Sequence, residues 1–549
     1  MTTASMLALT PEDTTSGAGA STDTTTPWPT SAEAIEALKQ GFDDDLTVIE
    51  HHEHRINPRT FPSPTTRPFN PVQVQRNTAF ARGTRPDYER WINHVTPAGE
   101  CAHPVVLRGT SLVIDKTTGE VLSSRSTEDM PDKAIYKACG NRRISVCPAC
   151  AEVYRQDTYQ LVLSGLVGGK GVPQTVQTHP SAFPTFTAPS FGLVHSRWAK
   201  HDEQAKICRP RRKPDPCPHG IDQRCFQRHH EGEKCLGQPL CLDCYDHLGQ
   251  VVWNLMAGEL WRRTMDKIKK TLQTWAKAHD TVIQLAYAKV AEMQNRGVAH
   301  FHALMRLDGL DSTDRSRVVP PLEHASFAIL DDAIRHAVAT TRFRTPKHPD
   351  SEDGWLIEWG QQLDVKPVRL SAKDAITETQ VAGYLAKYST KATEAAGHTS
   401  MRLTPATVGD HGRTDTHVGR LILACWKLGR SGANLDPEQL TKNSGRFNYR
   451  RLRRWAHMLG FGGHFSTKSR KYSTTLRALR EVRLNWRREH HRTAEHTDDI
   501  ETTLIVGHFS YAATGWHTTG DELLARTAAA QAREHRRVAR EELEALYLN

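Results

Sequence analysis

Two neighbouring stretches of the chain, Val282–Gln294 and Val298–Leu307, have the hydrophobic and polar pattern of a β-hairpin. The second stretch alternates with a period of two, which places His300 and His302 on one face and apolar residues on the other. Asn295-Arg296-Gly297 lies between them, and its glycine can adopt the backbone angles that a tight turn requires. The pattern therefore predicts two antiparallel strands with two histidines on one side.

Apolar residues at roughly helical spacing predict a long helix between Val251 and Trp275. The tail Asp521–Leu548 has the composition of a charged helix rich in Ala, Arg and Glu. Together with the hairpin, these elements indicate an α+β fold. The other elements expected from pattern are helices at Ser31–Leu46, Asp331–Thr341 and Thr377–Ala396, and strands at Phe183–Thr187 and Leu356–Leu370.

Length and composition limit the kinds of protein that this chain can be. At 549 residues it has room for about two to four domains with sizeable cores. Its apolar runs are shorter than a membrane helix requires. Met1–Thr30 is rich in Thr, Ser, Gly and Asp and lacks the basic start and apolar block of a signal peptide. We expect a disordered tail, a Pro-rich linker near Pro58–Pro71, no membrane partner and a cytoplasmic location.

The hairpin turn decides which side chain lies opposite the histidines. If the turn has three residues, Gln294 pairs with Val298 and Glu292 lies opposite His300, whereas a two-residue turn would put Met293 there. Two imidazoles and one carboxylate suit a Mn²⁺ or Mg²⁺ ion that bridges to a phosphate. The alternative is a half-buried strand with solvent-facing histidines, because His-x-His is a weak signal among 29 histidines.

A tyrosine pair follows about 80 residues after the histidines. Tyr384 and Tyr388 are four residues apart, so a helix would place both on one face, and Lys387 and Lys391 repeat the same spacing. A tyrosine has a pKa near 10 and needs help to attack phosphorus, and a nearby lysine can favour the phenolate or neutralise charge on the phosphate. The alternative is a helix with aromatic packing and solvated lysines.

Ten of the eleven cysteines lie between Cys101 and Cys244. In a cytoplasmic protein such clustering favours metal binding over disulfides. The first four of these cysteines supply the number of thiolates that a tetrahedral structural Zn²⁺ requires. The last two of the four, Cys147 and Cys150, form a Cys-x-x-Cys pair. His103 is an alternative to the first cysteine, and four free buried cysteines are the alternative to a zinc site. The first predicted zinc ligands are Cys101, Cys139, Cys147 and Cys150.

A second cysteine cluster offers more candidate ligands than one zinc ion needs. Its Cys-x-x-Cys pair is Cys241 and Cys244, and we expect Cys217 and Cys225 to complete the set, with His229 as the main competitor. Three further cysteine or histidine residues nearby could also bind the ion, so the choice of ligands stays open. The sequence thus predicts about two structural Zn²⁺ ions per chain, separate from the catalytic metal. The remaining candidates are Cys208, His230 and Cys235.

The positive charge of the chain is concentrated near the C-terminus. The chain carries +10 in total, whereas Arg446–Arg492 contains 14 lysines and arginines against two acids, which leaves about −2 for the rest. A helix would place four arginines of this segment in one stripe, and we expect the stripe to contact DNA phosphates. A solvated helix face is the alternative. The four residues are Arg477, Arg480, Arg483 and Arg487.

Three short motifs occur in the order found in HUH-endonuclease replication initiators. They are Phe183-Pro-Thr-Phe-Thr187, His300-Phe-His302 and Tyr384-x3-Tyr388. Three longer segments resemble the rolling-circle initiators of actinobacterial plasmids and integrative conjugative elements, and the similarity extends from about Cys101 to Leu548. These segments are Cys139-Gly-Asn-Arg-Arg-Ile-Ser-Val-Cys147-Pro-Ala-Cys150, Ala188-Pro-Ser-Phe-Gly-Leu-Val-His195 and Gly460-Phe-Gly-Gly-His464-Phe-Ser-Thr-Lys468-Ser-Arg470.

The resemblance implies an antiparallel HUH sheet with flanking helices, and a protein that nicks its origin. One tyrosine would attack one DNA strand, keep the 5′-phosphate covalently and free a 3′-OH for rolling-circle replication. Tyr384 and Tyr388 are then the candidate nucleophiles, and His300 and His302 are metal ligands. The expected regions are a tail and linker at 1–87, a zinc-binding region at 88–153, a nuclease domain at 154–400 with a cysteine-rich insert at 205–248, and a basic, largely helical DNA-binding region at 401–549.

The expected partners are single- and double-stranded origin DNA, a host helicase and a DNA polymerase. A host helicase is needed because the sequence contains no Gly-x4-Gly-Lys-Ser/Thr nucleotide-binding motif. Two alternatives with the same chemistry are a conjugative relaxase and an HUH transposase. The alternative from another class is a zinc-containing DNA-binding regulator without catalysis.

Overall fold

The computed structural model describes residues 70–197, 205–311, 313–314, 317–368, 377–391, 401–430, 447–490 and 503–548, all within the unit 59–549. The predicted tail, most of the predicted linker and the predicted helix Ser31–Leu46 lie outside these residues. Within the range expected to be tail and linker, α2 (Pro71–Gly83) is a regular helix. Asn70 caps it by accepting from two backbone N–H groups, and proline at the first helical position fits its fixed backbone angle.

The larger sheet has the strand order β10-β4-β6-β5-β11, and β7 pairs with β6. Every pairing in it is antiparallel. The α+β class expected from the sequence is therefore confirmed. Its strands are β4 (Ser181–Phe186), β5 (Ile283–Met293), β6 (Ala299–Leu310), β7 (Val318–Val319), β10 (Leu363–Pro367) and β11 (Ser466–Lys468).

The predicted hairpin is formed by β5 and β6. Gln294 N donates to Val298 O at 2.9 Å, and Gly297, with φ of +74°, closes a three-residue turn. Glu292 therefore pairs with His300, as the three-residue turn predicts. Alternate residues of β6 enter different apolar cores: Phe301 lies in one and Leu304 in the other. Both faces of the sheet are consequently buried.

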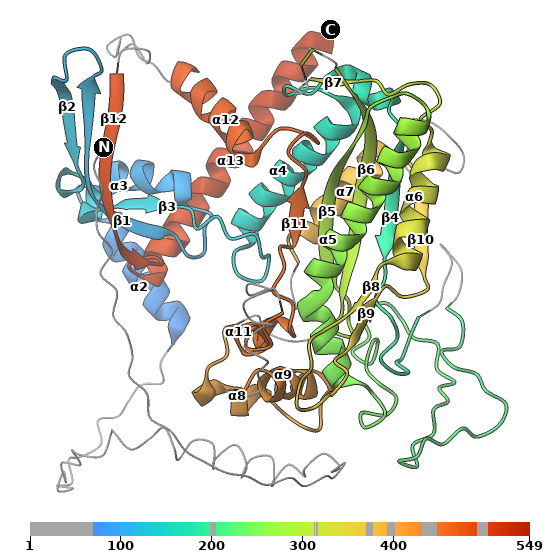
Figure 1. The fold of residues 1–549 in the computed structure, drawn as a ribbon. Helices are drawn as coiled ribbons and strands as arrows, with labels where there is room; N and C mark the ends of the chain where they lie inside the picture. The colour runs from blue at the N-terminus through green and yellow to red at the C-terminus, as the bar shows by residue number, and fades with distance from the viewer. Residues whose placement is uncertain are drawn as a thin grey trace, which may run out of the picture. The chain divides into compact units, whose positions relative to one another are not determined.

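Helices cover both faces of this sheet (Figure 1). The helices α5 and α6 share the larger core with one face, and α4 and α7 share the smaller core with the histidine face. The predicted long helix and the predicted helix Asp331–Thr341 are confirmed. The predicted helix Thr377–Ala396 is confirmed over its described residues. The four helices are α4 (Pro148–Val167), α5 (His247–Ala278), α6 (Phe327–Thr340) and α7 (Glu378–Ser389).

The strand expected at Leu356–Leu370 is two strands in two sheets. β9 (Leu356–Glu358) pairs with β8 (Arg342–Arg344), whereas β10 pairs with β4. Gly360 separates them, and a Cβ at this position would lie 2.4 Å from the carbonyl oxygen of Ala188. Gly360 N also donates to the Thr187 carbonyl at 2.7 Å, so the chain between the two strands packs closely on another backbone segment, which composition alone does not reveal.

A smaller sheet joins segments from both ends of the described chain. Its order is β12-β1-β2, β3 also pairs with β1, and the adjoining core includes Trp91, Val95 and Ala525. One strand of the predicted region 88–153 thus pairs with a strand of the predicted region 401–549, about 400 residues further along the chain. The elements are α3 (Tyr88–Val95), β1 (Val105–Asp115), β2 (Val121–Ser126), β3 (Ile135–Lys137), β12 (Thr503–Thr514) and α13 (Thr519–Leu548).

Apart from β11 and β12, the regular elements described in the C-terminal region are helices, as expected. Leu421 of α9 and Leu452 of α11 belong to the larger core, so these helices pack with the sheet that carries the histidines. Within the described part of the chain, no helix is both long enough and apolar enough to span a membrane. The remaining helices are α8 (Pro405–His411), α9 (His417–Leu428), α11 (Arg451–Arg454) and α12 (Leu476–His490).

Candidate functional site

His300 and His302 lie on the face of β6 that α7 covers. Their side chains are buried, with relative exposures of 9% and 5% for the two residues. The alternative of solvent-facing histidines is therefore wrong. The two rings lie 4.7 Å apart between centroids, and His302 stacks on Phe183 of β4 at 6.1 Å.

A carboxylate reaches the histidines from the neighbouring strand. The Oε2 atom of Glu292 lies 3.2 Å from Nε2 of His302. The other nitrogen of His302, Nδ1, lies 3.2 Å from the hydroxyl of Thr185, and Nδ1 of His300 lies 3.4 Å from Nε2 of Gln294. The Thr185 hydroxyl can accept from Nδ1 of His302, the contact that orients a metal-binding histidine. The amide nitrogen of Gln294 is a donor, so Nδ1 of His300 accepts in this contact.

Burial decides the charge of His300. Burial, together with the smaller effects of His302 and Arg296, lowers the pKa of His300 to about 3. The imidazole is therefore neutral near pH 7, the form that binds a metal. Donor types and burial fit a divalent ion, but the three residues are not a preformed ligand set. In the described residues, four groups bring candidate ligand atoms within 4.8 Å of one another, and none includes His300, His302 or Glu292.

Both tyrosines point from α7 toward these groups. A capping box of Thr377 and Gln380 begins the helix, and the hydroxyl of Tyr384 lies 3.2 Å from Nε2 of His302. The ring of Tyr388 lies 4.5 Å from that of Tyr384 and 5.9 Å from that of His302. Helical spacing therefore does bring both rings to the histidine face.

Burial raises the pKa of both tyrosines, and the carboxylate of Glu292 adds to the rise. Each hydroxyl is therefore protonated near neutral pH. The predicted lysines lie beside Tyr388: the Nζ atom of Lys391 is 4.6 Å from its ring centroid and that of Lys387 is 5.8 Å away. Cation–π contact is the interaction present here.

Three buried polar residues hold the hairpin turn, and sequence reasoning missed them. Asn254 of α5 donates to the carbonyls of Gly297 and Leu459 and accepts from Ala299 N. The carbonyl of Arg296 lies 2.9 Å from both Gln250 Nε2 and His417 Nε2. A signal exists in the sequence, because Gln250 and Asn254 are polar residues four apart on the apolar side of the predicted helix.

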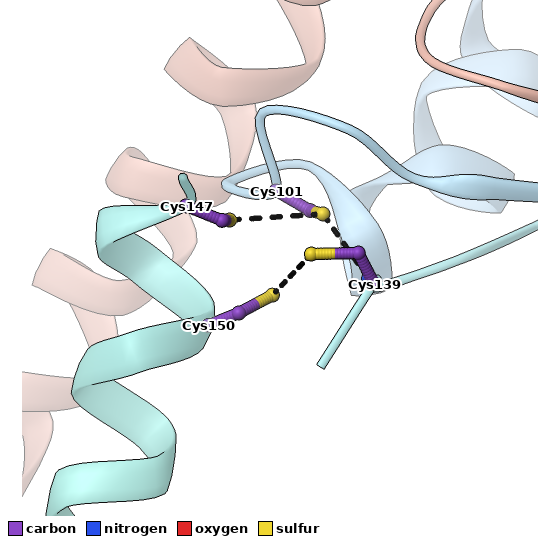
Figure 2. Close-up of side chains that lie close together, drawn as sticks. All are labelled: Cys101, Cys139, Cys147 and Cys150. Atoms are coloured by element: carbon purple, nitrogen blue, oxygen red, sulfur yellow. Dashed lines mark hydrogen bonds between the residues drawn. The ribbon is translucent and has the colours of Figure 1, made fainter. Parts of the chain in front are cut away.

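The first predicted cysteine set is brought together. Cys101, Cys139, Cys147 and Cys150 place their sulfur atoms within 4.8 Å of one another (Figure 2). Two of the distances, Cys139 to Cys150 and Cys101 to Cys147, are 3.6 and 3.9 Å. A tetrahedral zinc site with Zn–S bonds of about 2.3 Å has S–S edges of about 3.8 Å. The four thiols could therefore hold a zinc ion with little movement.

The segment between these cysteines also contacts the tyrosine helix. The Arg142 guanidinium donates to the carbonyls of Ser389 and Lys391 at 2.9 and 2.8 Å, and Ile144 N donates to Thr390 O at 3.3 Å. A cation at a helix C-terminus also stabilises the helix dipole. The first cysteine cluster is thereby connected to the end of α7 that carries Tyr388.

The second predicted set is not brought together. Cys217, Cys241 and Cys244 do converge, but their fourth neighbour is His219, whereas Cys225 belongs to a separate group with His195, Cys208 and His229. An antiparallel bridge pairs Cys225 with Arg209 and so draws it toward Cys208. Spacing could not show this pairing, because the chain folds back between the two groups.

The arginine stripe of α12 has acidic partners that the local sequence does not contain. Arg480 and Arg483 both pair with Asp157 of α4, whose side chain is only 2% exposed, and Arg477 pairs with Glu481 within its own helix. Two of the four arginines therefore help to pack α12 on α4. Arg446 and the side chain of Arg487 lie outside what the structure describes.

A basic and aromatic cavity of about 300 Å³ adjoins the Arg142 segment. Its wall contains cationic and aromatic residues of the kind that bind single-stranded nucleic acid through phosphate contact and base stacking. Part of the wall comes from the Gly460–Arg470 segment. The residues are Arg142, Arg143, Trp455, His457, Met458, Phe461, Gly463, His464 and Phe465.

Similarity to known proteins extends over most of the chain. A family model described as "Replication initiator protein, pSAM2" matches residues 87–530, a range that includes all three sheets of the described residues. A curated "Replication initiator protein" of Streptomyces ambofaciens is 40% identical over 467 residues, which are 83% of this chain and 93% of that protein. No solved structure matches. The chain therefore belongs to the pSAM2 family of replication initiator proteins.

Proposed function

We propose that the chain initiates rolling-circle replication by nicking one strand of its origin through a covalent 5′-phosphotyrosine. The observation that carries the proposal is the meeting of Glu292, His302 and the Tyr384 hydroxyl, each 3.2 Å from the next, on one buried face of the sheet. Side chains with no chemical task are seldom gathered in this way, because burying polar groups costs free energy. The sheet is, in this proposal, an HUH nuclease fold.

The reaction transfers one phosphodiester bond. The tyrosine oxygen bonds to phosphorus while the bond from phosphorus to the 3′ oxygen breaks. The phenol gives up its proton, and the departing 3′ oxygen takes up a proton and becomes the 3′-OH that a polymerase extends. The two imidazoles and the carboxylate of the site would hold Mg²⁺ or Mn²⁺, which neutralises charge on the phosphate when bound. His300, His302 and Glu292 are the proposed ligands.

Tyr388 is our candidate for the first attack. Two lysines lie beside its ring, and their charge favours a phenolate and opposes the charge that grows on the phosphate. Tyr384, whose hydroxyl lies against His302, is the candidate for the second transfer, which releases the displaced strand. The cavity that adjoins Arg142 is a candidate path for the displaced strand. A host helicase would unwind the duplex and so supply this single strand.

Nicking of supercoiled DNA that carries the element's own origin tests the proposal. We expect a covalent protein–DNA adduct on the 5′ end, formed with Mn²⁺ or Mg²⁺ and not with EDTA. The double variant His300→Ala, His302→Ala should bind the duplex but lose nicking, because the one remaining carboxylate is too few protein ligands to hold the ion against water. Duplex binding without an adduct would instead indicate a regulator, and wild-type rates in the double variant would overturn the metal assignment.

A further inference from the structure

Four side chains converge in the cysteine-rich insert, a name that from here includes the adjoining segment 188–197. They are His195, Cys208, Cys225 and His229, and their ligand atoms all lie within 4.8 Å of one another. Nε2 of His229 is 3.2 Å from Nδ1 of His195 and 3.5 Å from Sγ of Cys225. A zinc tetrahedron with bonds of about 2.0 Å to nitrogen and 2.3 Å to sulfur has edges of about 3.3 to 3.8 Å. The observed spacings match these edges.

The surroundings of this group are those of a metal site. Nδ1 of His229 lies 2.7 Å from Oε2 of Glu233, which orients the ring so that Nε2 faces the other three residues. The backbone N–H of Ser196 donates to Sγ of Cys208 at 3.3 Å, an interaction that stabilises a thiolate. His229 and both cysteines are buried. Buried sulfur and nitrogen donors that are held in this way are typical of a structural zinc site.

A second group in the same insert has comparable geometry. Nδ1 of His219 lies 3.3 Å from Sγ of Cys244, 3.7 Å from that of Cys241 and 4.0 Å from that of Cys217. Backbone N–H groups of His219 and Ile221 bond to the Cys217 sulfur, an interaction that stabilises a thiolate. This group supplies three sulfurs and one nitrogen.

The order of the ligands along the chain connects the two groups. His195 and Cys208 belong to the first group, Cys217 and His219 to the second, Cys225 and His229 to the first, and Cys241 and Cys244 to the second. Each group therefore takes its ligands from two pairs of residues, and a pair that belongs to the other group lies between them in the sequence. Neither half of the insert can complete a site alone, so binding at both sites would fix one fold of this loop-rich segment.

The geometry points to two interleaved structural zinc sites in the insert, one with two cysteines and two histidines and one with three cysteines and one histidine. With the four-cysteine cluster, the chain holds three Zn²⁺ ions on nine cysteines and three histidines. Cys235 is outside this set. Its sulfur lies 3.4 Å from Nδ1 of His229, the nitrogen that Glu233 occupies, and not on the Nε2 side where the other ligands converge.

Native mass spectrometry of the full chain, purified without chelator, tests the proposal. We expect three zinc ions in the wild type and two in Cys208→Ser and in Cys217→Ser. Cys235→Ser is the matched control, because it removes a thiol of the same insert and should keep three ions. A wild type with two ions or fewer, or a Cys208→Ser variant that keeps three, would overturn the proposal.

Thiol labelling of the wild type extends the test to the case in which a variant does not fold. In the zinc-loaded chain, iodoacetamide should modify Cys235, which is partly exposed, while Cys208 and Cys225 react only after a chelator removes the metal. Peptide mapping gives the rate at each cysteine. If Cys208 and Cys225 react equally fast with and without chelator, they bind no ion. Zinc content and thiol reactivity do not depend on nicking, so the zinc sites and the proposed function are tested independently.

Discussion

At the scale of single residues, each histidine of the site has two nitrogens with different tasks. Neighbours occupy Nδ1 of His300 and of His302, and Nε2 of His302 faces Glu292 and the Tyr384 hydroxyl. His302 Nε2 is therefore the atom where the proposed ion, the carboxylate and a tyrosine meet. In the described geometry Tyr384 contacts that nitrogen directly, so metal binding would require its hydroxyl to move aside.

Glu292→Gln tests whether the carboxylate is a ligand. The amide keeps the size of the side chain and its place on β5 but removes the negative charge that holds a divalent cation. We expect nicking at a fixed Mn²⁺ concentration to fall by at least about 100-fold and to recover partly at higher Mn²⁺. Asp364→Asn, an exposed carboxylate of the same sheet, should change neither. Equal rates for Glu292→Gln and wild type would remove Glu292 from the site.

The tyrosine variants separate the two proposed transfers. Tyr388→Phe should abolish the first adduct, whereas Tyr384→Phe should still form it and accumulate it, because the second transfer is blocked. The rings keep their packing, so the unfolding free energy should change by less than about 1 kcal/mol. Mass spectrometry of the nucleotide-modified peptide identifies the nucleophile. An adduct in the double variant Tyr384→Phe, Tyr388→Phe would contradict the mechanism.

The histidines and tyrosines that sequence reasoning found share one property: each has a partner at a short, regular spacing. Period two places His300 beside His302, and helical spacing places Tyr384 beside Tyr388, so local geometry was sufficient. Asn254 and His417 were missed because their partner, the hairpin turn, is about 40 and 120 residues away. Cys225 was grouped wrongly for the same reason, because a backbone bridge to Arg209 decides its neighbours.

At the scale of elements, the cysteine-rich insert rests on the turn of the β5–β6 hairpin. Gly237 has φ of +80°, and a Cβ there would lie 2.6 Å from the backbone nitrogen of Arg296. The side chain of Arg296 in turn donates to the Pro189 carbonyl at 3.4 Å. The strands that carry Glu292 and His300 are thus held from the insert as well as from α5.

Gly237→Ala should disturb this contact without removing a metal ligand. We expect it to lower stability by about 1–2 kcal/mol for the left-handed backbone and by about 1–3 kcal/mol for the clash. Nicking should decrease while the zinc content stays unchanged. Gly171→Ala is the control, because its φ is +84° and a Cβ there meets nothing within 4 Å, so only the backbone cost applies. Thermal unfolding that is identical in the two variants would show that the contact is unimportant.

The ion pairs of α12 divide the arginine stripe into two functions. Arg477 is 87% exposed, so Arg477→Gln should lower the slope of log K against log salt for duplex binding by about one, with unchanged stability. Arg480→Gln with Arg483→Gln leaves the buried Asp157 without cationic partners and should cost about 1–3 kcal/mol. Urea unfolding and salt titration of the same variants distinguish the two. A loss of slope only in the second variant would reverse the assignment.

Elements were predictable where hydrophobic periodicity decides them. The hairpin, the long helix α5 and the tyrosine helix depend on patterns of 10 residues or more, and their apolar sides face the two cores as expected. The prediction of a single strand at Leu356–Leu370 was wrong because Gly360 packs against the backbone of Thr187 and Ala188, which the local pattern does not contain. The arginine stripe of α12 was similarly predicted to lack acidic partners, because Asp157 lies on another helix, α4.

At the scale of the whole described unit, the ends of the chain are joined in one small sheet and one buried ion cluster. The Arg82 guanidinium of α2 binds Asp132 at 3.0 Å and Asp521 of α13 at 2.7 Å, with all three side chains at most 7% exposed. Burial would raise the pKa of Asp132, but Arg82, Trp91 and Tyr136 hold it below its usual value. Its contribution to stability is therefore present above the ordinary Asp pKa near 4 and is lost as the pH falls through its lower folded value.

Arg82→Met should separate the two ends of the chain. Methionine keeps much of the apolar contact with Trp91, but it leaves two buried carboxylates without a cation, which costs about 3–5 kcal/mol in comparable pairs. Hydrogen exchange should show faster opening of β12 and α13, while the amides of β5 and β6 stay protected, because their sheet has separate cores. Arg85→Met is the matched control: its ion pair with Asp87 is exposed and should contribute no more than about 1 kcal/mol. If both variants opened the same amides at the same rate, the buried cluster would not be what joins the N-terminal and C-terminal segments.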